Sequence, residues 1–300
     1  MFIAYAFVGK LPSYIKESIH QSRCFFEGDI YLIIDDINSI HLKDIEKYNV
    51  KIIDYNNVKS NAFLDIANKN MHKFCIVNEL GDRKLLFIRS FERFFLLHNL
   101  MVQNNMVDCL FLELDNLIYD DPTKWVENFK QNELCYMFDN YNRYSSGIMF
   151  VKNSASLIGF LNENLSFIST SNEFISEMAV LSIHYGKNKN SVQILPTYWN
   201  DNSVPMETYL NYNKYGDSIF DAAAMGCYLF GLDTLHTNNT IVKYQKNPWA
   251  AIDYTKNKFE WVLDDKGLKR PYIWDGNKWL LINNLHIHAK NLSEALSTPM

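Results

Sequence analysis

The first 120 residues alternate short apolar runs with helical periodicity, and this alternation constrains the fold more than any other feature. Apolar runs occupy 3–8, 30–34, 50–53 and 107–112, and helical patterns follow Pro12 and span 85–101. Continuous apolar runs are typical of strands buried on both faces, and strands alternating with helices build parallel sheets. The sequence therefore predicts the α/β class, with a Rossmann-like, mixed but mainly parallel sheet flanked by helices.

The second half is more mixed. Apolar runs at 135–138, 148–151 and 192–195 indicate strands, and 157–165 and 174–185 indicate helices. The chain is loop-rich from Trp199, and apolar patterning returns at 220–229 and 279–288. We expect this half to extend the same sheet. The prediction is a single domain, 1–300, with halves 1–120 and 121–300.

Composition excludes some partners. Lys and Arg number 29 against 34 Asp and Glu, a net charge of −5, so the basic footprint of a nucleic-acid-binding protein is missing. No apolar run approaches the roughly 18 residues of a membrane span. Five scattered cysteines without CxxC spacing favour reduced thiols. We expect a soluble, cytoplasmic protein, in the host cytoplasm if the chain is viral. The oligomeric state is left open.

Polar residues follow several of the predicted strands: Gly9, Asp35, Asp36, Glu113 and Asp115. Ligands of parallel sheets bind beyond the carboxyl ends of the strands. Glu113 and Asp115 are two residues apart, so in extended backbone they face the same way and can converge on one cation. Carboxylate oxygens suit Mg²⁺ or Mn²⁺. The alternative is an ordinary solvated strand end.

A second group of chemically active residues lies near residue 290. In strand geometry His286, His288 and Lys290 share one face. An imidazole could complete the coordination of a metal, and the ammonium of Lys290 could neutralise negative charge on a leaving group. The alternative is a pair of core or surface histidines. The pattern does not decide which histidine would bind the metal.

Taken together, these segments resemble the nucleotide-sugar-dependent glycosyltransferases of the GT-A fold. The similar segments are 7–9 with 11–15, 92–95, the DxD-type 111–116, 145–148, 220–226 and 285–290. They are spread over most of the chain. One departure is Glu113, which stands where aspartate is commoner in the motif, although its longer carboxylate can still reach a metal.

The resemblance implies a metal-dependent glycosyltransferase that moves a sugar from a nucleotide sugar, UDP-linked, to a glycan or other hydroxyl acceptor. Residues 1–120 would form the nucleotide-sugar half and 121–300 the acceptor side. Mn²⁺ or Mg²⁺ would be held by Glu113, Asp115 and His286 or His288. The implied donor-binding residues are Ala6, Phe7, Val8, Asp35, Asp36, Arg93, Leu114 and Lys290.

Lys290, Asp221 and Glu177 are the candidate catalytic residues, the last two as bases. Asp221 has an alternative as the N-cap of an apolar helix, and Glu177 as a solvated residue in mid-helix. Arg93 would hold a donor carboxylate or diphosphate, or else form an ordinary helix-surface ion pair with Glu92 or Asp82.

A different function class also fits the sequence, namely a non-catalytic glycan-binding or assembly protein on a GT-A scaffold. Such a protein keeps the aromatic residues but needs no metal. A nucleotidyltransferase fits poorly, because such an enzyme needs a glycine-rich, basic phosphate-binding loop near the first strand. The segment 9–12 contains only one glycine and one lysine.

Overall fold

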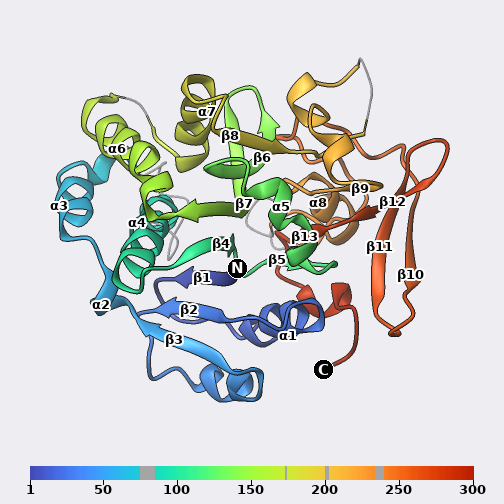
Figure 1. The fold of residues 1–300 in the computed structure, drawn as a ribbon, viewed down its shortest axis with the longest axis horizontal. Coiled ribbons are helices and arrows are strands. Elements are labelled where there is room, and N and C mark those ends of the chain that lie inside the picture. Colours follow the sequence, from blue (N-terminus) through green and yellow to red (C-terminus); the bar gives the residue numbers. More distant parts are fainter. Residues whose placement is uncertain (75–84, 173, 200–202, 234–239) are drawn as a thin grey trace.

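A seven-stranded sheet forms the centre of the molecule (Figure 1). The computed structural model describes residues 1–74, 85–172, 174–199, 203–233 and 240–300. The strand order is β3-β2-β1-β4-β7-β6-β8. These strands are β1 (Phe2–Phe7), β2 (Ile30–Ile34), β3 (Val50–Asp54), β4 (Val107–Leu112), β6 (Leu134–Asn140), β7 (Arg143–Asn153) and β8 (Val192–Leu195). Only β7 runs against its neighbours, so the predicted mixed, mainly parallel sheet is confirmed.

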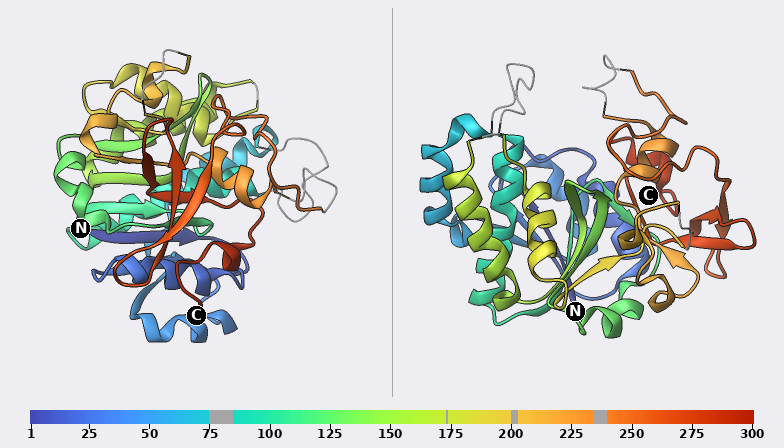
Figure 2. Two further views of the ribbon diagram at one scale, coloured as in Figure 1. Left: turned by 90° about the vertical axis from the view of Figure 1, so that its right-hand side faces the viewer. Right: turned by 90° about the horizontal axis from the view of Figure 1, so that it is seen from above.

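Helices cover both faces of this sheet. They are α1 (Ile15–Phe25), α2 (Tyr55–Val58), α3 (Asn61–Lys69), α4 (Leu86–Gln103), α5 (Val126–Phe129), α6 (Ser154–Thr170), α7 (Glu177–Lys187) and α8 (Ala224–Phe230). Seen from above, α3, α4, α6 and α7 form one layer, and α1 and the C-terminal segments lie on the other side (Figure 2). Among the described residues, no helix has the length and apolar character needed to cross a membrane.

Strand β1 shows how the sheet divides the core. Ile3 and Tyr5 belong to the hydrophobic cluster that includes α1, whereas Phe2 and Ala4 belong to the cluster that includes α4. Successive side chains of a strand point to opposite faces. An apolar run without alternation therefore buries both faces, as the sequence predicts.

The second half differs in part from expectation. Strands β6, β7 and β8 extend the central sheet as predicted. However, β9 (Ser218–Ile219), β10 (Phe259–Leu263), β11 (Lys269–Trp274) and β12 (Trp279–Ile282) form a separate four-stranded sheet. The helix expected from Phe174 begins only at Glu177, because the Ser176 side chain accepts a hydrogen bond from the Ala179 N–H and caps it.

The chain finally returns to its first half. Strand β13 (Asn284–His286) pairs antiparallel with β5 (Asn116–Ile118), which directly follows the acidic pair. Further on, the Gln21 side chain of α1 donates to Ser297 Oγ at 2.8 Å and accepts from the Ser297 N–H at 2.9 Å. Through the pairing of β13 with β5, the C-terminal segment lies beside the carboxyl end of β4.

Candidate functional site

Glu113 and Asp115 lie in the turn between β4 and β5. The Glu113 N–H donates to the Gly147 carbonyl at 3.0 Å, and the Ile287 N–H donates to the Asp115 carbonyl at 2.8 Å. The neighbouring strands β7 and β13 thus fix the backbone of the acidic pair. Because β1, β2 and β4 are parallel, the pair lies at the sheet edge where β1 and β2 also end. This is the edge at which such sheets bind ligands.

His286 meets both carboxylates. In the β5–β13 ladder His286 is paired with Asn116, which brings the imidazole beside the turn. Its Nε2 lies 3.1 Å from Glu113 Oε2 and 3.4 Å from Asp115 Oδ1. One ligand atom from each of the three residues lies within 4.8 Å of the others. The structure therefore joins the middle of the chain to its far end in one cluster.

The charges of this cluster are strongly coupled. Burial alone would raise the pKa of Glu113, but Arg93 and His286 lower it to about 2. Burial also opposes ionisation of Asp115, yet Lys290 and His286 hold the pKa of that carboxyl well below its usual range. Burial would lower the pKa of His286, but Asp115 and Glu113 raise it to about 10. Two ionised carboxylates thus face one imidazole nitrogen.

This donor set fits a divalent cation. Two carboxylates and one imidazole are ligands that Mn²⁺ and Mg²⁺ accept, the oxygens suiting both ions. His286 and Lys290 place positive charge beside the two acids. A bound divalent cation would balance the same negative charges. Glu113 keeps a partly exposed side chain, so the cluster is open to solvent on one side.

His288 and Lys290 lie beside the cluster. The rings of His286 and His288 contact each other edge to face, with centroids 4.5 Å apart. Burial and the neighbouring His286 and Lys290 charges lower the pKa of His288 to about 3, so it is neutral. Lys290 has a left-handed backbone and its Nζ contacts Asp115 Oδ2. Nε2 of His286, in contrast to His288, faces both carboxylates.

Arg93 connects the cluster to α7. Its guanidinium contacts Glu113 Oε1, and its Nη2 lies 3.1 Å from Glu177 Oε1 and donates to Ser146 Oγ at 2.9 Å. The surface-pair alternative is therefore wrong for Glu92, which instead accepts from Arg89 and Tyr55. Asp82 lies outside the described residues. Arg93 is a half-buried bridge between two acids.

Glu177 is the first residue of α7 and is only 6% exposed. The expectation of a solvated, mid-helix position is wrong, because the helix starts later than the apolar pattern suggests. Burial raises the pKa of Glu177 although Arg93 opposes this. Its role as a base stays a prediction.

The Asp221 carboxylate is fully buried. It accepts hydrogen bonds from the N–H groups of Ala223, Met225 and Gly226 at the start of α8, and from that of His286. The N-cap alternative is wrong in position, because α8 begins at Ala224 with Ala223 as its N-cap, two residues after Asp221. The Asp221 carboxylate nevertheless accepts from N–H groups of the first turn of α8. Burial raises the pKa of Asp221 although these N–H donors oppose it. A role as base stays a prediction for this residue too.

The predicted nucleotide end lies at the same sheet edge. Asp35 Oδ1 accepts from the Gly9 N–H at 2.8 Å, and Asp36 Oδ2 accepts from the Leu11 N–H at 3.3 Å. The two acids thus shape the loop after β1. Ala6, Phe7 and Val8 are half-buried beside them. The side chain of Leu114 packs in the core. Binding of a nucleotide by these residues stays a prediction.

Sequence reasoning missed part of the surroundings. Asn284 donates to Asn116 Oδ1 and to the Asp221 carbonyl, each at 2.9 Å. A Cβ on Gly147 would lie 2.9 Å from His286 Nδ1, so this position needs glycine. A signal existed in Asn283–Asn284, a polar pair that interrupts an apolar run.

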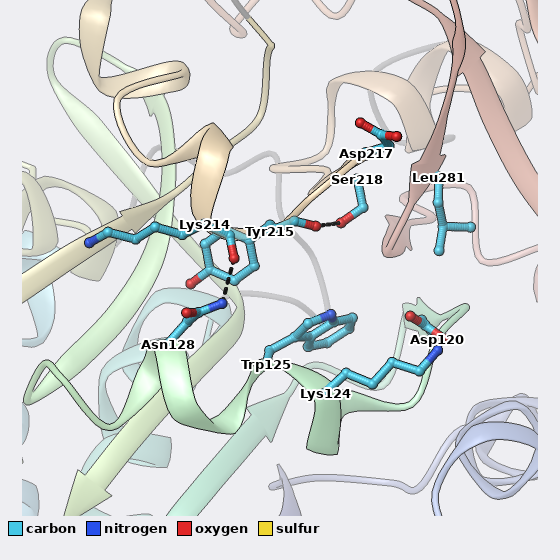
Figure 3. Close-up of a pocket in the computed structure, with 9 residues that line it drawn as sticks. All are labelled: Asp120, Lys124, Trp125, Asn128, Lys214, Tyr215, Asp217, Ser218 and Leu281. Carbon is cyan, nitrogen blue, oxygen red and sulfur yellow. Dashed lines mark hydrogen bonds and ion pairs between the residues drawn. The ribbon is translucent and has the colours of Figure 1, made fainter.

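A separate cavity of about 270 Å³ lies away from the cluster (Figure 3). Its walls include Trp125, Asn128 and Tyr215, and the carboxylate of Asp120 at its rim pairs with Lys124 and Arg270. None of Glu113, Asp115 and His286 lines this cavity, and its mixed charges select no single ligand.

No family model and no curated protein sequence matches the chain. Similar solved structures include the apo form of mouse xyloside xylosyltransferase 1, with 10% identity, a TM-score of 0.46, and coverage of 66% of this chain and 86% of that one. The glycosyltransferase GlyE of Streptococcus pneumoniae TIGR4 has 15% identity, a TM-score of 0.41 and coverages of 64% and 45%. The WbbM bifunctional glycosyltransferase has 10% identity, a TM-score of 0.42 and coverages of 66% and 39%. The chain thus spans less than half of GlyE or WbbM. These are partial similarities of fold, and the function proposed below rests on the site.

Proposed function

We propose that the protein is a metal-dependent glycosyltransferase that transfers a sugar from a UDP-linked donor to a glycan or other hydroxyl acceptor. The observation that carries this proposal is the convergence of Glu113, Asp115 and His286 at the carboxyl edge of a mainly parallel sheet. The chain has a net negative charge, and two carboxylates would repel a diphosphate unless a bound cation lay between them.

A bound Mn²⁺ or Mg²⁺ would supply positive charge to the diphosphate leaving group. Glu113, Asp115 and His286 would hold the ion, with the Nε2 of His286 as the nitrogen ligand. Lys290 adds an ammonium beside Asp115, which can neutralise charge on the departing phosphate oxygens. Arg93 fixes one oxygen of Glu113 and leaves Oε2 directed at His286.

The remaining assignments complete the proposal. The base and ribose of the donor would lie along Ala6–Val8, at the end of β1, and beside Asp35 and Asp36, which follow β2. Because β1 and β2 are parallel, both segments lie at the same edge of the sheet. Of the two candidate bases, Glu177 belongs to the ion-pair network of Glu113, and its raised pKa favours acceptance of a proton.

The test is metal-dependent binding and turnover of the donor. Thermal unfolding is followed with UDP and a panel of UDP-sugars, each with Mn²⁺ and with EDTA. A ligand at one hundred times its Kd stabilises the folded state by about 2.7 kcal/mol, which is a readily measured shift in Tm. We expect this shift only with Mn²⁺, together with slow donor hydrolysis when no acceptor is present.

Variants locate the ligands. Glu113→Gln with Asp115→Asn, or His286→Ala alone, should abolish the Mn²⁺-dependent shift. His288→Ala should retain it, because its ring does not face both carboxylates. Asp120→Asn is the matched control, because this buried carboxylate pairs with Lys124 and Arg270 and is not one of the proposed ligands. Equal shifts in the double variant and the control would refute the proposal, and glycan binding without metal or hydrolysis would establish the non-catalytic alternative.

A further inference from the structure

The way His286 is held differs from the usual arrangement of a metal-binding histidine. Such a histidine normally donates its second ring N–H to a carboxylate, carbonyl or water, which fixes the ring. Here Nδ1 is buried and has no hydrogen-bond partner among the residues that the structure describes. Something other than a hydrogen bond at Nδ1 must therefore support the position of Nε2.

The Asp221 carboxylate holds the backbone of His286 instead. Its Oδ2 accepts from the His286 N–H at 3.1 Å and from the Gly226 N–H at 2.8 Å. Its Oδ1 accepts from the N–H groups of Ala223 and Met225, both at 2.9 Å. One fully buried carboxylate therefore ties the start of α8 to a residue 65 positions later in the chain.

Two glycines allow His286 to pack closely on both sides. A Cβ on Gly226 would lie 2.1 Å from the His286 carbonyl oxygen, and a Cβ on Gly147 would lie 2.9 Å from its Nδ1. The first contact is with backbone that cannot rotate away. Helix α8 thus touches the main chain of His286, and β7 touches its ring.

We propose that Asp221 is a positioning residue that acts through His286 and sets the place of Nε2 for a divalent cation. Asp221, Gly226 and Gly147 together form what we call the His286 socket. The inference rests on the proposed function, since it assumes that the cluster binds a metal. It replaces the role of base for Asp221, because both of its oxygens are occupied by N–H donors and neither is exposed.

Asp221→Asn tests the socket directly. All four partners are N–H donors, so the new amide nitrogen meets two donors whichever way the side chain is turned. We expect Mn²⁺ to bind about 10- to 100-fold more weakly, the range typical of lost outer-shell support. Binding is measured by the EPR signal of free Mn²⁺, with and without UDP. Asp120→Asn should match the wild type.

Turnover separates positioning from proton transfer. A positioning role predicts that Asp221→Asn recovers most of its kcat at saturating Mn²⁺, because the loss lies in the affinity for the ion. A base role predicts a low kcat at every Mn²⁺ concentration and unchanged Mn²⁺ affinity. The second result would overturn the inference.

Gly226→Ala provides a second route if Asp221→Asn does not fold. Its methyl group would press on the His286 carbonyl, so we again expect weaker Mn²⁺ binding. Gly159→Ala and Gly186→Ala are matched helix controls, since a Cβ at Gly159 meets an atom only at 3.5 Å and one at Gly186 meets none within 4 Å. Both controls should bind Mn²⁺ normally.

The outcomes distinguish the two proposals. If the wild type binds no Mn²⁺, the proposed function fails. If the wild type binds Mn²⁺ and a folded Asp221→Asn or Gly226→Ala variant binds it equally well, only the socket fails. If neither variant folds while both glycine controls do, Asp221 serves the fold as a whole, and the positioning role is refuted.

Discussion

At the scale of single residues, the carboxyl edge of the sheet concentrates buried charge. Glu113, Asp115 and Glu177 are all partly or fully buried, and each contacts a basic side chain. Burying an ion without a partner costs several kcal/mol, so such pairing is required for the fold to tolerate them. Asp139, at the end of β6, is a further buried acid of this edge, paired with Arg143.

Asp139 makes stability depend on pH. Burial raises the pKa of its carboxyl from 3.8 to about 6, more than the Arg143 charge lowers it. Between about pH 4 and pH 6 the folded state therefore binds more protons than the unfolded state, and the free energy of unfolding falls as pH rises. One pKa unit corresponds to about 1.4 kcal/mol. We expect Asp139→Asn to remove this loss.

The measurement is urea denaturation at several pH values from 4 to 8, comparing the wild type with Asp139→Asn. As pH rises from 4 to 6, the unfolding free energy of the wild type should fall relative to that of Asp139→Asn. Above pH 6 the difference between the two proteins should stay constant. Arg143 keeps access to solvent and so tolerates the change. A pH-independent difference would show that Asp139 ionises normally.

At the scale of elements, α4 and α7 are joined to β4 through Arg93. Methionine at this position removes the charge and keeps much of the volume, but it leaves Glu177 without its basic partner and Glu113 with His286 alone. Breaking a buried pair in this way costs about 3–5 kcal/mol. We expect Arg93→Met to lose stability in this range, and Arg93→Met with Glu177→Met to regain part of it. Strictly additive losses in urea denaturation would contradict a coupled bridge.

The first half of the fold could be predicted because its strands carry a strong local signal. The apolar runs that form β1, β2 and β4 are largely buried on both faces, so no alternation obscures them. The edge strand β3 has no buried residue and is signalled only by its short apolar run. The strands β10 and β11 are not predicted, because β10 has no buried residue and β11 has only two, so neither gives a clear apolar pattern. The apolar patterning at 279–288 covers β12, but it does not show that this strand joins a separate sheet. The start of α7 was misplaced because the apolar pattern extends past the Ser176 cap.

The sequence predicts which residues form the cluster of Glu113, Asp115 and His286, but it does not predict how they come together. Glu113 and Asp115 stand out because they follow a predicted strand and are two residues apart. His286 and His288 stand out because they have the same spacing. Which histidine faces the acids depends on the pairing of His286 with Asn116, a contact 170 residues apart that no local pattern encodes. The contacts of Arg93 with Glu177 and of Asp221 with His286 likewise join residues that are 84 and 65 positions apart, so they are visible only in the fold.

At the scale of the whole molecule, the two halves complete each other. Strand β4 of the first half pairs with β7, and β5 pairs with β13. A fragment of residues 1–120 would therefore expose one edge of β4, leave β5 unpaired and lack the cations that neutralise Asp115. We expect this fragment to be unfolded, whereas the complete chain unfolds in one transition.

Far-UV circular dichroism and the dispersion of amide NMR signals measure the state of the fragment. For the complete chain, coincident transitions by circular dichroism and tryptophan fluorescence would establish a single cooperative unit. A fragment that unfolds cooperatively on its own would show instead that 1–120 is an independent domain, against the single domain predicted from the sequence.

The contact between His286 and the turn at 113–115 also governs how the molecule is made. While the ribosome is still working, Glu113 and Asp115 emerge long before the histidine and lysine that balance them. Until then Glu113 has only Arg93 as a basic partner, and Asp115 lacks both His286 and Lys290. The cluster can therefore form only after His286 has been synthesised, so termination of translation ahead of residue 286 would yield a product unable to assemble it.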